Sequence, residues 1–494
     1  MDSDDQARLL GLFSGLASDA AAVAIALDQP ERAVELLEYG RGVLLTRAHD
    51  AGADLAALRA QAPRLAARLA ELQAALDDFA VPSAGAMSPA GVAGPAPERR
   101  YDLAVRRREV LTEIRERPGF ADFLRPPPFA ALAGAAVDGP VVLVNVAARR
   151  CDALVVADGR VELAPLPELT LAELINRTAA FLTAIAVLTG PPDPNTPEPA
   201  TQRRRAAARA EIGRTLDWLW RVVAAPVLDA ALPAPAPSDP HWPRLWWCST
   251  GLLTLLPLHA AGPLDGGDGV LDRVVPSYTA SLRALAHARR GVPSRPEPVD
   301  SALVVGMPQT PGLADLPGVG REEEIVRRYL PRVRSLLGPA ATPAAVLAAL
   351  PEQPVVHLSC HGTQDLHAPA WGRLALAGGA LHVRDLWRPA GNPGALAVLS
   401  ACETVRGGAA LPDEALTLGT AFQLAGFRQV IGALWSISDA LTVRLCADVY
   451  DGLAVPGGIA PDRAAAALHQ AVRRLRATLP GLPDVWAGYA HLGP

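Results

Sequence analysis

The amino-acid sequence predicts an α/β protein built on a doubly wound, mostly parallel sheet with flanking helices. From residue 298 onward, short apolar runs alternate with segments of helical character. Such runs are typical of strands buried on both faces, and strands that helices separate form parallel sheets. The predicted strands are 301–308, 355–362, 396–404 and 429–435. The predicted helices are the amphipathic segment REEEIVRRYL and the segments at about 414–426, 440–453 and 461–478.

The middle of the chain also has α/β character, but its residues form no cluster that looks reactive. Three apolar runs at 141–147, 151–159 and 161–166 predict an antiparallel meander. Two long helices are expected next, at 171–188 and 202–231, and a further strand at 244–250. The segment at 291–298 is rich in proline and marks a joint, so we place one domain at 101–297 and another at 298–494.

The N-terminal part is predicted to be helical over residues 4–78, because leucines such as Leu58, Leu65, Leu69 and Leu72 recur at helical spacing. The segment ERAVELLEYGRGVLLTRA is similar to half of a tetratricopeptide repeat. A solenoid needs about three repeats, so this region is either the stub of an array or a helical cap. We assign 1–80 to this region and 81–100, rich in small residues, to a linker.

Composition and charge exclude several classes of function. The 494 residues carry 46 basic and 51 acidic side chains, a balance that gives no basic surface for nucleic acid. Five cysteines without a C-x-x-C pair argue against a zinc ribbon or a disulfide framework. The acidic start MDSDDQ is unlike a signal peptide, and no uncharged apolar run reaches about 18 residues. We therefore expect a cytoplasmic protein with no membrane span and no nucleic-acid partner.

Two side chains stand at the expected catalytic edge of the sheet. One predicted strand ends at His361 and Gly362, and the next large one ends near Cys402. The carboxyl ends of parallel strands share an edge, so an imidazole and a thiol should meet there. A histidine can raise the thiolate fraction of a cysteine and later protonate a leaving amine. The amides of Gly362 and Cys402 would then stabilise the oxyanion of a tetrahedral intermediate.

Other interpretations of these residues stay open at this stage. A buried cysteine is usually a small apolar side chain, and a histidine after a strand is usually structural. His357, Cys360 and His361 could suggest a metal site, but position 360 faces away from the other two on a strand, and no carboxylate adjoins them in the sequence. The glycines of LVVGMPQTPGLADLPGVG fit no phosphate-binding pattern. We expect no metal and no cofactor.

The stretches PVVHLSCHG, LAVLSACET and AFQLAGFRQVIGALWSISD resemble the CHAT family, the caspase-like domain associated with tetratricopeptide repeats. The segments GLLTLLPLHAAG, LPGVGREEE and PDVWAGYAHLGP agree in order, so the resemblance covers roughly 130–494. That family belongs with caspases, gingipains and separases among the peptidases with a His–Cys dyad. The resemblance implies a caspase-like fold in which 101–297 is an inactive companion half. It implies that His361 is the catalytic histidine, Cys402 the nucleophile and Gly362 an oxyanion donor, with His357 in the core.

The function expected from these residues and this resemblance is that of a cysteine endopeptidase that cleaves a protein partner encoded nearby. We expect it to be latent until a partner or signal activates it, with an activating protein docking on the N-terminal helices, and to act in bacterial defence. The alternative is a catalytically silent scaffold for protein–protein interaction. Asp439 matches the acid of the W-x-x-x-D pattern of separases, which implies a pocket for a basic substrate residue. The competing role for Asp439 is an N-cap of the following helix.

Overall fold

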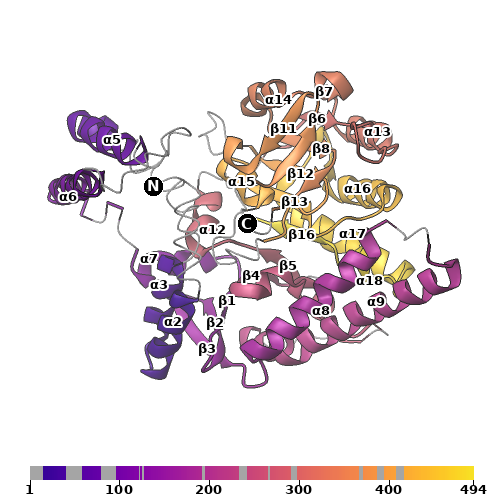
Figure 1. Cartoon of the computed structure of the whole chain (residues 1–494), viewed down its shortest axis with the longest axis horizontal. Coiled ribbons are helices and arrows are strands. Elements are labelled where there is room, and N and C mark those ends of the chain that lie inside the picture. Colours follow the sequence, from indigo (N-terminus) through magenta and orange to yellow (C-terminus); the bar gives the residue numbers. More distant parts are fainter. Residues whose placement is uncertain are drawn as a thin grey trace, which may run out of the picture.

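The computed structural model describes residues 15–40, 58–78, 96–121, 123–124, 127–191, 195–232, 242–264, 267–290, 297–365, 371–386, 394–407 and 417–494. Among these residues, eleven strands form one large mixed sheet with helices on both faces (Figure 1). In sheet order the strands are β3 (Arg160–Pro165), β2 (Cys151–Ala157), β1 (Val141–Val146), β4 (Arg244–Ser249), β5 (Val275–Tyr278), β16 (Tyr489–Leu492), β13 (Gln429–Ala433), β12 (Leu396–Ser400), β8 (Val355–Ser359), β6 (Ser301–Gly306) and β7 (Arg332–Leu337).

The C-terminal half of the sheet is parallel, as the alternation of apolar runs and helices predicted. β7, β6, β8, β12 and β13 all run in one direction. The central strands β8, β12 and β13 are buried almost along their whole length, which explains their unbroken apolar sequences. The helices of this half are α13 (Val319–Tyr329), α14 (Pro343–Ala349), α15 (Leu418–Leu424), α16 (Asp439–Leu453) and α17 (Ala464–Thr478). Helices α13 and α16 pack side by side on one face (Figure 1).

The preceding half extends the same sheet rather than forming a separate one. β3, β2 and β1 form the predicted antiparallel meander, and β1, β4 and β5 are parallel to one another. The predicted helix at 171–188 is α8 (Leu171–Thr189). The second predicted helix consists of three pieces, α9 (Glu198–Leu219), a π-helical turn (Trp220–Ala224) and α10 (Ala225–Ala231).

The last strand of the chain joins the two halves. β16 lies between β5 and β13, parallel to the first and antiparallel to the second. Its buried His491 contacts Ser277 Oγ at 2.8 Å through Nδ1 and Gln429 Oε1 at 2.7 Å through Nε2. Burial lowers the pKa of His491 well below its usual value, so this imidazole is neutral. No pattern in the sequence indicates that β16, at the end of the chain, pairs with a strand that precedes residue 297.

The first two described helices cover the outer end of the sheet. α2 (Leu16–Ala26) and α3 (Pro30–Gly40) pack on each other and against β1 and β3. Ala33 and Leu37 join a core cluster with Leu143 and Trp246. Glu38 is buried, and its Oε1 accepts a hydrogen bond of 2.7 Å from Leu282 N at the start of α12 (Leu282–Arg289). This arrangement matches the helical-cap interpretation of residues 16–40.

A second helical pair forms its own small apolar cluster. α5 (Pro63–Asp78) packs against α6 (Ala96–Arg115), and the cluster includes Leu69, Ile114 and Phe120. Residues 81–95 of the predicted linker lie outside the described residues, and 96–100 belong to α6, which packs with α5. The low apolar content at the start of α6 hides this helix from a reading of composition.

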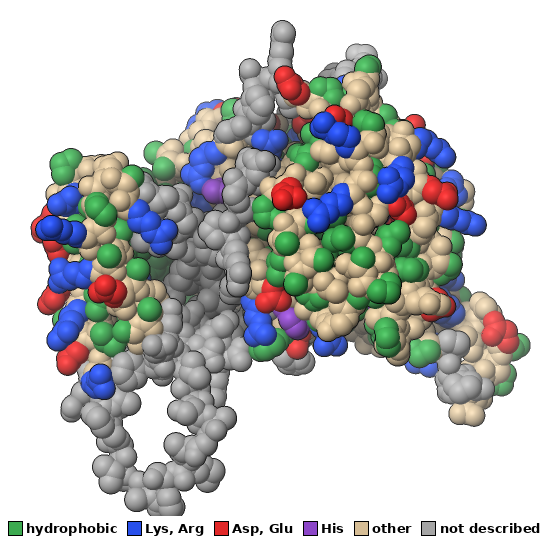
Figure 2. Space-filling model, turned by 90° about the horizontal axis from the view of Figure 1, so that it is seen from above, with side chains coloured by type: hydrophobic (Ala, Val, Ile, Leu, Met, Phe, Trp, Pro, Cys, Tyr) green, Lys and Arg blue, Asp and Glu red, His purple; other side chains and the backbone are tan. Residues whose placement is uncertain are grey.

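Two features relate to the expectation of no nucleic-acid partner and no membrane span: the surface charge and the apolar helix α8. Figure 2 shows acidic and basic side chains intermixed over the face in view, consistent with the near balance of charge. Among the described helices, α8 is long and apolar enough to cross a membrane by length and composition. Its Leu174, Phe181 and Ile185 are buried in the main core. Core helices can have the same length and apolar composition as membrane spans.

Candidate active site

The ends of β8 and β12 bring His361 and Cys402 to the same edge of the sheet, as the sequence predicted. These strands are parallel neighbours in a register that pairs Ser359 with Ser400. His361 and Cys402 each follow two residues later on their own segments. Directly after His361, the chain forms the short strand β9 (Gly362–Thr363). It pairs with β10 (Arg373–Leu376), which in turn pairs with β11 (Gly379–His382) to complete a side sheet.

Gly362 contacts the backbone of Cys402. A β-carbon at position 362 would lie 2.5 Å from the carbonyl oxygen and 3.4 Å from the amide nitrogen of Cys402, so a larger residue does not fit. The amide of Ala375 donates a hydrogen bond to the carbonyl of His361, so these two residues form a hydrogen-bonded pair. Such pairs alternate along an antiparallel ladder, so the next pair, Gly362 and Leu374, is not hydrogen-bonded. The amide of Gly362 is therefore not used in pairing with β10, as an oxyanion donor requires.

The imidazole of His361 is oriented by a backbone carbonyl. Its Nε2 lies 2.7 Å from the carbonyl oxygen of Ala314, which can only accept a hydrogen bond. Nε2 therefore carries the proton, and Nδ1 is the nitrogen that can accept another one. Ala314 lies in the exposed segment that leads into α13.

The thiol of Cys402 is held by Ser436 and stands apart from the other cysteines. Cys402 Sγ donates to Ser436 Oγ at 3.1 Å. Burial raises the pKa of the Cys402 thiol, although the Ser436 hydroxyl and the amide of Ile437 act to lower it. The resting thiol is thus protonated at neutral pH and needs a base. Of the five cysteines, all described, Cys402 alone is half-buried and the rest are buried. Burial raises the pKa of Cys360 to about 12, which makes that thiol inert.

Glu403 ties the loop of Cys402 to the segment of His361. Its backbone adopts a φ of 56°, a left-handed conformation that is uncommon for a residue with a side chain. Its Oε2 accepts a hydrogen bond of 3.1 Å from Gln364 N, two residues beyond Gly362. Its other oxygen pairs with Arg406. These contacts fix the turn that presents Cys402.

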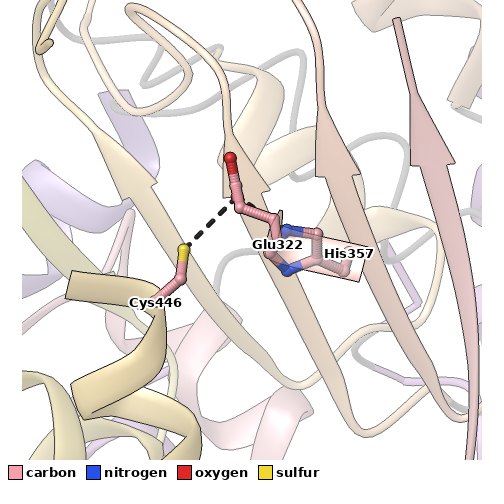
Figure 3. A group of neighbouring side chains, drawn as sticks. All are labelled: Glu322, His357 and Cys446. Atoms are coloured by element: carbon pink, nitrogen blue, oxygen red, sulfur yellow. Dashed lines mark hydrogen bonds and ion pairs between the residues drawn. The ribbon is translucent and has the colours of Figure 1, made fainter. Parts of the chain in front are cut away.

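A buried polar cluster lies beneath the two strand ends (Figure 3). The carboxylate of Glu322 on α13 lies 2.8 Å from His357 Nε2 and accepts 2.8 Å and 3.4 Å hydrogen bonds from Ser359 Oγ and Cys446 Sγ. No carboxylate adjoins His357 in the sequence, but α13 brings one from 35 positions away.

The same cluster is the candidate metal site among the described residues. Glu322, His357 and Cys446 offer ligand atoms that lie within 4.8 Å of one another. Glu322 already binds both His357 and Cys446, and Tyr450 Oη lies 3.3 Å from His357 Nδ1. A cation would have to displace these hydrogen bonds. We therefore interpret the cluster as a polar core that joins β8, α13 and α16. His357 takes the core role that the resemblance implied.

Asp439 lies at the first position of α16, and its carboxylate binds another part of the chain. The N-cap of α16 is Ser438, and no side chain caps that end, so the N-cap role for Asp439 is wrong. Instead, Asp439 Oδ2 accepts a hydrogen bond of 2.7 Å from Gly318 N, just before α13. A pocket role for Asp439 stays a prediction.

Sequence reasoning missed Ala314, Ser436, Glu322 and Glu403. Ala314 acts through its backbone carbonyl, which no residue type reveals. The other three lie within the quoted segments LPGVGREEE, LAVLSACET and QVIGALWSISD, but nothing in the spacing shows which side chain each contacts. Those contacts depend on which distant elements the fold places side by side.

For the peptidase activity proposed in the next subsection, replacing Gly362 with alanine is expected to lower cleavage about 100-fold, because the new methyl group would push the His361 segment away from Cys402. The matched control is Gly379→Ala on β11, where a β-carbon would meet only Pro343 Cγ at 3.8 Å. The kcat of both variants, measured on one peptide, checks this. Equal activity of the two variants would contradict the close approach.

The CHAT domain model matches residues 213–494, so the family match begins after β3 and α8. Among curated proteins, none matches the sequence significantly. A chain of the separase–securin complex of Saccharomyces cerevisiae is similar in structure, with a TM-score of 0.50 and 9% identity over 94% of this chain. The match spans 37% of that longer chain and shows the likeness of fold alone. The complex of Porphyromonas gingivalis RgpB pro- and mature domains matches 65% of this chain and 76% of its own, with 12% identity and a TM-score of 0.34.

Proposed function

Because the chain belongs to the CHAT domain family, we propose that it is a cysteine endopeptidase in which His361 and Cys402 form the catalytic dyad. The observation that carries this proposal is the shared edge of β8 and β12, where both side chains follow paired residues. The absence of a β-carbon at Gly362 lets the two segments touch. The half-buried thiol and the oriented imidazole supply a nucleophile and a base.

The proposed reaction assigns a role to each of these groups. Nδ1 of His361 accepts the thiol proton of Cys402, and the sulfur attacks the carbonyl carbon of the scissile peptide bond. The amides of Gly362 and Cys402 stabilise the oxyanion, and Ala314 accepts a hydrogen bond from the imidazolium. His361 then protonates the leaving amine as the C–N bond breaks. Water hydrolyses the remaining thioester and restores the thiol.

The substrate and control of this activity are also proposals. We infer a protein substrate encoded nearby, latency until a partner or signal activates the enzyme, and a place in bacterial defence, as the family resemblance implies. The N-terminal helices are the proposed docking surface for an activator, since α2 exposes Leu16, Val23 and Leu27 on one side. The other side of α2 and α3 packs on the sheet, so deleting residues 1–80 would also uncover the core.

The alternative is a silent scaffold, and the reactivity of Cys402 separates the two functions. We expect a limiting amount of iodoacetamide to alkylate Cys402 first, as mass spectrometry of the digested protein would show. Since His361 is the proposed base, the His361→Ala variant should react more slowly at Cys402. Labelling of Cys402 at the same rate in both proteins, without cleavage of a peptide library by the parent, would favour the scaffold.

A further inference from the structure

The two groups that hold the dyad lie in segments that lead into neighbouring helices. Ala314 precedes α13 and binds His361, whereas Ser436 precedes α16 and binds Cys402. The helices themselves pack side by side. The relative placement of these two lead-in segments therefore sets the relative placement of imidazole and thiol.

One hydrogen bond joins the two segments directly. Asp439 Oδ2, at the start of α16, accepts the amide proton of Gly318 at 2.7 Å. The contact is close, since a β-carbon at Gly318 would lie 2.6 Å from both carboxylate oxygens. Gly318 is buried and Asp439 is half-buried, so water competes little for this bond.

The segment at 308–318, before α13, folds into a compact turn. Its internal hydrogen bonds run from Leu313 N to Thr310 O at 3.0 Å and from Leu316 N to Pro308 O at 2.9 Å. Ala314 at its tip is exposed, so packing does not fix its carbonyl. A bond at Gly318 therefore controls where the compact turn presents Ala314.

The geometry points to Asp439 as a positioning residue, which holds the turn at 308–318 so that the carbonyl of Ala314 meets Nε2 of His361. This inference rests on the proposed function only in that His361 is the base. The carboxylate acts by accepting a hydrogen bond from the backbone, and an amide oxygen can do the same. It follows that position 439 needs a hydrogen-bond acceptor for Gly318 N, but that this acceptor does not need to be charged.

This role makes a prediction opposite to that of a substrate pocket. A carboxylate that pairs with an arginine of the substrate would lose its selectivity in Asp439→Asn. A positioning residue would keep its effect in Asp439→Asn and lose it in Asp439→Ala. The loss would appear in kcat, and it would be equal for substrates with a basic or an apolar residue before the cut.

The experiment compares the parent, Asp439→Asn, Asp439→Ala and the control Arg444→Ala, an exposed position on α16 that contacts Thr478 of α17. Hydrogen exchange of the peptide containing Gly318 is measured first, because it needs no turnover. We expect faster exchange in Asp439→Ala alone. We also expect the kcat of that variant to fall about 100-fold with KM little changed, while Asp439→Asn stays near the parent.

Several outcomes would overturn the inference. Unchanged exchange at Gly318 in Asp439→Ala would show that the bond anchors nothing. A loss confined to basic substrates in Asp439→Asn would assign the residue to a pocket. If the parent cleaves no peptide, the proposed function fails, and the ring ¹⁵N signals of His361 decide the positioning role. A mixture of ring tautomers in Asp439→Ala supports it, and retention of the Nε2–H tautomer refutes it.

Discussion

Replacing Cys402 with alanine is expected to abolish peptide cleavage, with a fall in kcat of about a million-fold or to the limit of detection. His361→Ala should cost nearly as much, because the imidazole is the proposed base for a thiol whose pKa burial raises. The two residues act as one unit, so the double variant should be no worse than either single one. The assay is cleavage of one peptide by all three variants.

The control for this prediction is Cys360→Ala, at a thiol beside the dyad histidine. Cys360 is 2% exposed, and burial raises the pKa of its thiol to about 12, so it should contribute packing alone. We expect this variant to keep most of its activity and to lose some stability. Cleavage by Cys402→Ala at the rate of the parent, or complete loss in Cys360→Ala, would mean that the nucleophile is misassigned.

The position of His361 and Cys402 at one edge of the sheet was predictable from sequence, because it follows from a rule about sheets. Unbroken apolar runs such as 396–400 indicate strands buried on both faces, and such strands are parallel. Parallel strands share a carboxyl edge, so His361 and Cys402 had to be near each other once both strands were recognised. In the structure, Ser359 pairs with Ser400, so the residues that follow each strand start from the same level of the sheet.

Contacts between distant helices could not be predicted in the same way. Glu322 and Asp439 are both acidic residues near helix starts, and local rules assign such residues to solvent or to a cap. Each of them reaches another element because α13 and α16 lie side by side, and no periodicity in either segment encodes that pairing. The position of β16 could not be predicted either, since its two partner strands, β5 and β13, lie far apart in the chain.

The largest expected loss of stability follows from replacing Glu322, the acid at the centre of the polar core. Its carboxylate accepts hydrogen bonds from Ser359 and Cys446 and pairs with His357. Glu322→Ala would leave these groups buried without that acceptor, at a cost of about 3–5 kcal/mol. Glu322→Gln keeps one acceptor oxygen but turns an amide toward other donors, which should cost about 1–3 kcal/mol. Denaturant unfolding of the full chain at neutral pH measures both.

The loss should depend on pH in a definite direction. Burial opposes the ionisation of Glu322, but the hydrogen bond and charge of His357, with hydroxyls of Ser400 and Ser359, bring the pKa of Glu322 below its ordinary value of 4.5. A carboxyl group whose pKa is lower in the folded state stabilises the fold above the unfolded pKa. That contribution is lost as the pH falls through the folded pKa. The stability advantage of the parent over Glu322→Gln should therefore shrink in acid.

The matched control is Glu324→Ala, an exposed glutamate two positions along the same helix. It should change the free energy of unfolding by no more than about 0.5 kcal/mol. Equal stability of Glu322→Ala and Glu324→Ala would refute the central role of the buried carboxylate. A chelator supplies the last discrimination, since a core held by hydrogen bonds alone unfolds at the same denaturant concentration with or without it. A chelator-dependent fall in the parent, absent from Glu322→Gln, would instead identify Glu322, His357 and Cys446 as metal ligands.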